Sequence, residues 1–140
     1  MKRLFFCTAL LGSVTCYAQT GRLVVTVKGI NTTKGGELAT ALFTKDNFPR
    51  TGKEAKGIYT TITADQMQVV FEQVPAGTYA VAVYQDTDRD HKLKTNLVGY
   101  PTEPLGFSRD ARIRLGPPAF SDAALSIAAD QTVMTSVTLR

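Results

Sequence analysis

The stretch from Val74 to Asn96 constrains the fold most, because a turn, an alternating strand and an acidic loop follow one another in it without a spacer. Pro75 and Gly77 are typical of a tight turn, since proline presets φ and glycine tolerates positive φ. From Thr78 to Gln85 successive side chains point to opposite faces of a strand, and both sets are largely apolar. The pattern therefore predicts a strand that is covered on both faces and lies at the centre of the fold.

The rest of the chain consists of short apolar or β-branched segments, separated by turn signals about every eight to twelve residues. No sustained helical period occurs after residue 18. We therefore expect a single antiparallel β-sandwich of about seven or eight strands over residues 19–140. The expected strands are Gly21–Lys28, Glu37–Thr44, Ile58–Thr63, Met67–Val74, Thr78–Gln85, Ala111–Leu115, Ala123–Ala128 and Thr132–Leu139.

The connections between these segments carry their own expectations. Gly29–Gly36 is typical of a polar hairpin-type connection. Leu97–Phe107 contains two prolines and two glycines, which predicts an irregular segment. The last two strands are expected to form a closing pair, joined by a turn at residues 129–131.

Residues 1–18 have the pattern of a secretory signal sequence. Two basic residues precede an apolar run, Leu4–Val14, which is too short to span a bilayer. Small residues at Cys16 and Ala18 fit cleavage before Gln19. The mature domain is therefore expected to be exported, either periplasmic or extracellular, and a lipoprotein acylated at Cys16 is the alternative.

Composition excludes several classes of protein. The chain has 16 basic and 12 acidic residues, and removal of the signal with Lys2 and Arg3 leaves a net charge of only +2, so we expect no nucleic-acid partner. Both cysteines lie in the signal, so the mature domain is expected to have no disulfide and no thiolate metal site. No second apolar run is long enough for a membrane helix.

The predicted central strand leads directly into three aspartates at every second position, Asp86, Asp88 and Asp90. Carboxylates spaced in this way along a turning loop bring their oxygens together, as a hard cation such as Ca²⁺ requires. The backbone carbonyl of Lys92 and the side chain of Asn96 are the further oxygen donors expected there. The loop therefore predicts a candidate calcium site at these five residues.

Two residues of the loop oppose a calcium ion. His91 stands where a calcium loop of this kind has glycine, and Lys94 stands where a further carboxylate would help. Three clustered carboxylates repel one another at neutral pH, so something must neutralise them. A bound cation is one possibility, and the neighbouring basic residues Arg89, Lys92 and Lys94 are the other.

A second candidate surface follows the acidic loop. Tyr100, Phe107, Arg109 and Arg112 are candidate binding residues, because aromatic and arginine side chains are enriched in binding hot spots. The alternative is that Phe107 plugs the end of the sandwich while Arg109 pairs with Asp110, since a loop rich in proline and glycine must be pinned by something.

Groups suited to catalysis are scarce. His91 is the only histidine, and no Gly-x-Ser-x-Gly elbow surrounds any serine. We therefore expect a non-catalytic protein that binds or scaffolds in the cell envelope, with an envelope protein or a small molecule as its unidentified partner. The alternatives are a small hydrolase, which would need His91 in a deep pocket with arginines, and a module that pairs with an envelope partner through an open sheet edge.

Several segments carry a resemblance to a known family. They are Phe71–Val83, the acidic loop from Asp86, Leu97–Ser108 and Gly116–Ala123, in this order. Together they resemble the exported bacterial domain of unknown function 2141, over nearly the whole chain from about Leu23 onward.

The resemblance implies a β-sandwich of the transthyretin (prealbumin) or carboxypeptidase-regulatory type, which is immunoglobulin-like in its layers, with no established activity. In that family the acidic loop typically continues with a glycine and ends on a further aspartate. This sequence keeps oxygen donors at Asp86, Asp88 and Asp90, and it departs from the pattern at His91 and Lys94.

Overall fold

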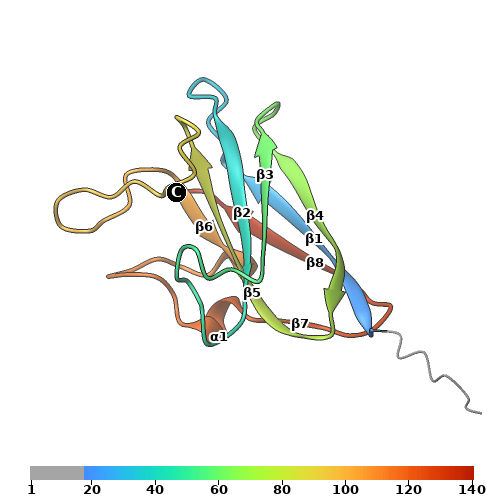
Figure 1. Cartoon of the computed structure of the whole chain (residues 1–140). Helices are drawn as coiled ribbons and strands as arrows, with labels where there is room; N and C mark the ends of the chain where they lie inside the picture. Colours follow the sequence, from blue (N-terminus) through green and yellow to red (C-terminus); the bar gives the residue numbers. More distant parts are fainter. Residues whose placement is uncertain (1–17) are drawn as a thin grey trace, which may run out of the picture.

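The computed structural model describes residues 18–140, so the predicted signal sequence and Cys16 lie outside the described range, apart from Ala18. The regular elements of the described chain are almost all strands (Figure 1). The elements are β1 Thr20–Lys28, β2 Glu37–Phe43, β3 Lys56–Thr61, β4 Met67–Pro75, β5 Gly77–Asp86, β6 Leu105–Phe107, the 3-10 turn η1 Ser108–Asp110, α1 Phe120–Ala123, β7 Leu125–Ile127 and β8 Thr132–Thr138. Within residues 18–140 no helix is long and apolar enough to cross a membrane.

The strands form two sheets, which confirms the predicted β-sandwich (Figure 1). One sheet has the order β4-β1-β8, and the other has the order β3-β2-β5-β6, with β7 paired to the start of β5. All described strand pairs are antiparallel except the pair of β1 and β8, which run parallel. The first and last strands of the domain therefore lie side by side.

The main core lies between the two sheets, where alternate residues of the strands point inward. Val25 and Val27 of β1 face Val81 and Val83 of β5, and none of the four is exposed to solvent. Burial of each such side chain contributes about 1.5–3 kcal/mol. The period of two in these strands therefore fixes which face of each sheet is internal.

Strand β5 is apolar on both faces because a second cluster covers its outer side. Ala80, Ala82 and Tyr84 point away from the main core and pack with Leu105, Phe107 and side chains from the segments after β2 and η1. On its edges β5 pairs with β2 on one side and with β6 and β7 on the other. The prediction of a central strand covered on both faces is confirmed.

The expected closing pair is wrong. β7 pairs with β5, so that Leu125 lies opposite Tyr79, whereas β8 pairs with β1, so that Val137 lies opposite Val27. The turn between β7 and β8 thus carries the chain from one sheet to the other. Gly29–Gly36 likewise connects β1 of one sheet to β2 of the other and is not a hairpin. Each strand pairs where a neighbouring strand edge is open, and proximity in the sequence does not decide which strands pair.

Two local expectations also differ from the structure. Leu105–Phe107 forms the short strand β6 in spite of Pro104 and Gly106. Glycine is needed at position 106, because a Cβ there would lie 2.5 Å from the carbonyl oxygen of Thr138. Residues 111–115 form no strand, since no neighbouring strand is there to pair with them.

Candidate functional site

A pocket of about 470 Å³ lies on the outer face of the five-stranded sheet. Its floor is made of small residues, Ala39 and Ala41 of β2, Ala82 of β5 and Gly57 of β3. Ala41 is in register with both Gly57 and Ala82, so the small side chains form one row across three strands. Because these residues leave space above the sheet, larger neighbours can stand around them as walls. The larger neighbours on the sheet are Phe43, Tyr59, Tyr84, Leu105 and Phe107.

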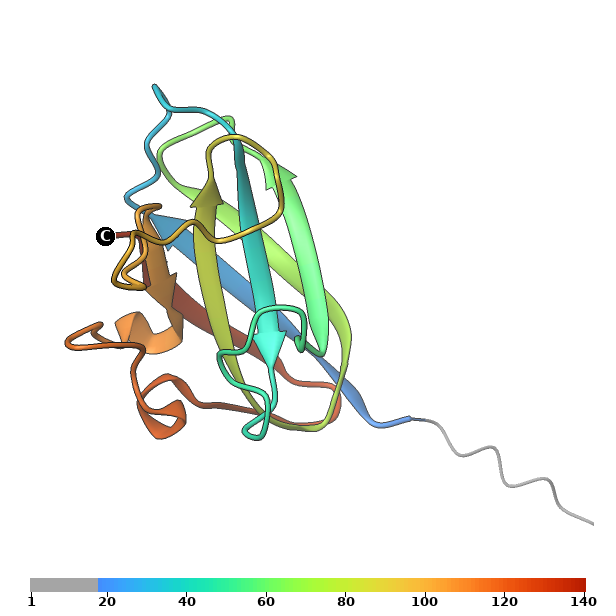
Figure 2. The same cartoon turned by 60° about the vertical axis from the view of Figure 1, so that its left-hand side comes forward.

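Three loops complete the walls of this pocket. They are the loop after β2, the loop after β5 and the segment 113–117, and in Figure 2 the first two lie in front of the sheet. Leu97, Val98, Tyr100 and Leu115 stand at or beside the mouth with largely exposed side chains. Exposed apolar side chains gathered at one place usually mark a binding site. The outer face of this sheet is therefore the main candidate site.

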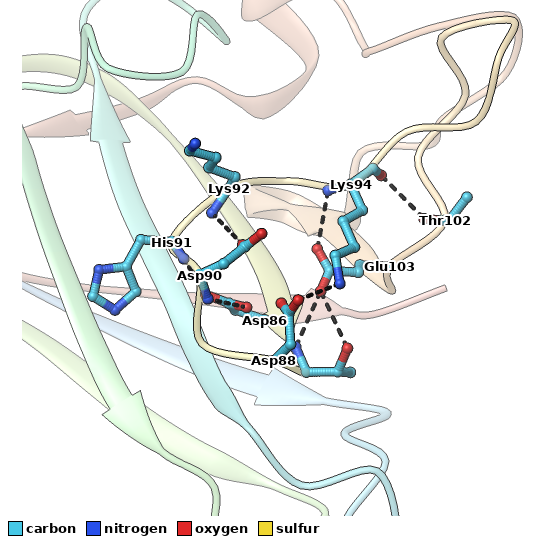
Figure 3. A network of polar contacts seen from close by, with 9 residues as sticks. Asp86, Asp88, Asp90, His91, Lys92, Lys94, Thr102 and Glu103 are labelled. Atoms are coloured by element: carbon cyan, nitrogen blue, oxygen red, sulfur yellow. Dashed lines mark hydrogen bonds and ion pairs between the residues drawn. The ribbon is translucent and has the colours of Figure 1, made fainter.

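The loop after β5 is folded by carboxylates that accept backbone hydrogen bonds (Figure 3). Asp86, at the end of β5, is fully buried, and its two carboxylate oxygens accept from the backbone N–H groups of Asp90 (3.3 Å) and His91 (2.8 Å). The carboxylate of Asp90 in turn accepts from the N–H of Lys92 at 2.9 Å. These bonds turn the loop back on itself.

Glu103 joins the loop from the segment before β6. It is only 6 % exposed, and its carboxylate accepts from the N–H of Thr87 (3.0 Å), the hydroxyl of Thr87 (3.3 Å) and the N–H of Lys94 (3.1 Å). It therefore ties together the two ends of the loop (Figure 3). This role of Glu103 was not predicted from the sequence, because no local pattern indicates it. Glu103 reaches the loop only because β6 returns beside β5.

Lys94 neutralises part of the acidic loop. Its ammonium group forms an ion pair with Asp88 (Figure 3). The hydrogen bond from Lys94 holds the pKa of Asp88 below its ordinary value, and the same contact raises the pKa of Lys94. The ion pair of Lys94 therefore supports the interpretation in which basic residues neutralise the loop.

The predicted calcium ligands are brought together only in part. Carboxylate oxygens of Asp86, Asp88 and Glu103 lie within 4.8 Å of one another and could hold a metal ion. The side chain of Asn96 instead accepts hydrogen bonds from the N–H groups of Val98 (3.1 Å) and Tyr100 (2.9 Å). Glu103 thus joins Asp86 and Asp88 in this cluster, whereas Asp90, which was also predicted as a ligand, is not part of it.

His91 connects the acidic loop to the wall of the pocket. Its ring stacks on Tyr59 of β3 with centroids 4.0 Å apart, and its Nε2 lies 2.6 Å from Oε1 of Glu37 on β2. The backbone of His91 has φ of 59°, a conformation that favours glycine, which agrees with the glycine expected at this position. Glu37, Asp86 and His91 also form a second group of potential metal ligands.

Carboxylates surround this end of the pocket and affect two tyrosines in it. Burial raises the pKa of Tyr59, and the charges of Glu54, Asp86 and Glu37 add to the increase. Burial also raises the pKa of Tyr84, with the neighbouring Tyr59 and Asp86 acting in the same direction. Both hydroxyls therefore stay protonated at neutral pH and lie in a negative potential.

The four candidate binding residues do not form one site. Tyr100 lines the pocket and is 56 % exposed, whereas Phe107 is 2 % exposed and packs edge-on against Phe48 at 5.6 Å, so it supports the pocket wall from within. Arg109 donates from Nη1 to the carbonyl of Ser121 at 3.3 Å, and Arg112 lines a separate shallow cavity.

Asp110 does not act as the local partner expected for Arg109. It accepts instead from the N–H of Thr138 at 2.6 Å, which fastens η1 to β8. Phe107 thus has the packing role given by the alternative interpretation, while the accompanying ion pair is replaced by a hydrogen bond to the neighbouring strand.

Comparison with known proteins identifies a family but no characterised relative. Neither the curated proteins nor the solved structures give a match. The family model DUF2141, described as an uncharacterized protein conserved in bacteria, matches residues 25–135. This range holds most of the described strands, the acidic loop and the pocket. The chain therefore belongs to the DUF2141 family of bacteria.

Proposed function

We propose that this protein is an exported, non-catalytic binding protein whose ligand site is the pocket on the outer face of the five-stranded sheet. The observation that carries the proposal is an apolar pocket of about 470 Å³ with exposed apolar residues at its mouth. Its volume falls in the range of sites for small molecules, about 300–1,000 Å³. Export is supported by the sequence pattern of residues 1–18.

The residues around the pocket favour binding over hydrolysis. The described residues that line it include His91 but no arginine and no cysteine, and the imidazole is engaged with Glu37 and Tyr59. A hydrolase of the kind considered from the sequence would need arginines that converge with the histidine on a substrate. A binding role needs only the cavity and its mouth.

We assign the acidic loop a supporting role in this function. Residues 93–101 of the segment after β5 form one wall of the pocket, and the carboxylates of Asp86 and Glu103 hold the loop in shape. Because the Lys94 ammonium pairs with Asp88, and backbone N–H groups donate to Asp86 and Glu103, the loop serves as a brace without calcium. The melting temperature should then be the same in calcium and in chelator. A rise with calcium concentration would show instead that an ion binds at Asp86, Asp88 and Glu103.

The pocket can be tested with the neutral apolar fluorophore N-phenyl-1-naphthylamine. We expect saturable binding with a fluorescence increase, and Ala41→Phe, which places a ring on the floor, should weaken it about tenfold or more, a loss of about 1.4 kcal/mol. Met134→Phe is the matched control, because Met134 is exposed on the other sheet. Equal affinity of the Ala41→Phe variant and the wild type would refute the proposed site.

A further inference from the structure

We propose that the pocket selects an organic cation, a ligand with an apolar body and an amine or quaternary ammonium group. The inference rests on the proposed binding function and adds the chemical class of the ligand. It follows from the charges around the pocket, from the aromatic side chains in its wall and from the absence of lysine and arginine among the described residues that line it.

Within residues 18–140 no lysine or arginine lines the pocket, although the chain has 16 of them. Among the described residues around the cavity, the only acidic side chain is Glu54 and the only titratable base is His91. Glu54 comes from the loop after β2 and its side chain is exposed at the pocket. An anionic ligand would therefore lose its hydration without gaining a positive partner, which is costly.

Further carboxylates lie behind the wall. Glu37 contacts the His91 ring that stacks on Tyr59, and the fully buried Asp86 lies at the end of β5, two residues beyond Tyr84. Burial is the main cause of the raised pKa of Tyr59, and the charges of Glu54, Asp86 and Glu37 add to it. A low-dielectric cavity strengthens such interactions, so the potential favours a positive group beside the two tyrosines.

The wall also offers aromatic faces to such a group. The cavity is lined by aromatic residues from four strands and a loop, Phe43, Tyr59, Tyr84, Phe107 and Tyr100. A cation over the face of an aromatic ring is attracted by the ring quadrupole, and aromatic pockets are a common way to bind quaternary ammonium groups. The alanine and glycine floor leaves room for the apolar body of the ligand.

Three probes that share a phenyl ring test the inference: benzyltrimethylammonium, its neutral analogue neopentylbenzene, and benzenesulfonate. Each competes with bound N-phenyl-1-naphthylamine on the purified protein. We expect the cation to bind about tenfold more tightly than the neutral analogue, a difference of about 1.4 kcal/mol, and the sulfonate to bind most weakly. Glu54→Gln should weaken the cation about threefold or more without changing the affinity for the neutral fluorophore, because it removes only the charge.

The control is Glu72→Gln, since Glu72 is an exposed residue on β4 that pairs with Arg22 away from the pocket. This variant should change neither affinity. If the neutral analogue binds as tightly as the cation, or Glu54→Gln leaves the cation affinity unchanged, the organic-cation inference is wrong while the binding function stands. If the fluorophore itself does not bind, the proposed function is wrong.

Discussion

Removal of the Glu103 carboxylate should destabilise the protein, because this carboxylate holds the loop that forms one wall of the pocket. Glu103 is buried and holds the N–H groups of Thr87 and Lys94 at 3.0 and 3.1 Å. In a Glu103→Ala variant both N–H groups lose their acceptor, and the two ends of the loop are no longer joined. The chain between these ends should then open more readily.

The magnitude follows from these contacts. A hydrogen bond to a charged group contributes about 1.5–3 kcal/mol net, so two of them set an upper range of about 3–6 kcal/mol. Lys94 is exposed and water can replace part of its bond, and the variant also avoids the cost of burying the carboxylate. We therefore expect a loss of about 3 kcal/mol in the free energy of unfolding. For a domain of this size that lowers the melting temperature by about 10 °C.

Urea unfolding followed by tyrosine fluorescence and by circular dichroism measures this loss. The slope m should stay unchanged, because the surface exposed on unfolding is nearly the same. Glu103→Gln keeps the volume and one acceptor oxygen, so it should cost less, about 1–2 kcal/mol. Glu72→Ala, which removes only an exposed ion pair, should cost about 0–1 kcal/mol. A Glu103→Ala variant as stable as the Glu72→Ala control would refute the role of Glu103 as a brace.

Phe107→Ala should cost about 3–5 kcal/mol in urea unfolding, because a 2 % exposed ring leaves a cavity, and a loss below about 1 kcal/mol would contradict its packing role. Gly36→Ala should destabilise more than Gly35→Ala, since both glycines have positive φ but only a Cβ at Gly36 overlaps the backbone of Asp86 and Thr87 at the end of β5. Equal losses of stability would show that backbone strain alone matters. Lys94→Met should raise the pKa of Asp88 toward its ordinary value in an NMR titration. Because the pKa of Asp88 is lowered in the folded state, the Lys94–Asp88 ion pair stabilises the protein above the ordinary aspartate pKa, and this stabilisation is lost as the pH falls through the lowered pKa. If Asp88 titrates in the variant as it does in the wild type, Lys94 is not the cause of the lowered pKa.

Features that depend on neighbouring residues could be predicted from the amino-acid sequence. The alternation of apolar side chains from Thr78 to Gln85 identified the central strand, and both of its faces are covered. The spacing of Asp86, Asp88 and Asp90 located the acidic loop, and the basic residue at Lys94 was recognised as the group that opposes a cation there. Strand period and turn chemistry act over a few residues, which makes them readable in order along the chain.

Contacts between residues far apart in the chain became visible only in the folded domain. Glu103 enters the acidic loop because β6 returns along β5, and Glu37 reaches His91 because β2 is the other neighbour of β5. The parallel pairing of β1 with β8 has the same origin. The pocket exists because Ala41 lies in register with small residues on both adjacent strands. Strand order and register depend on which edges stay open once the core is packed, and that choice is made by the whole domain and by no single segment.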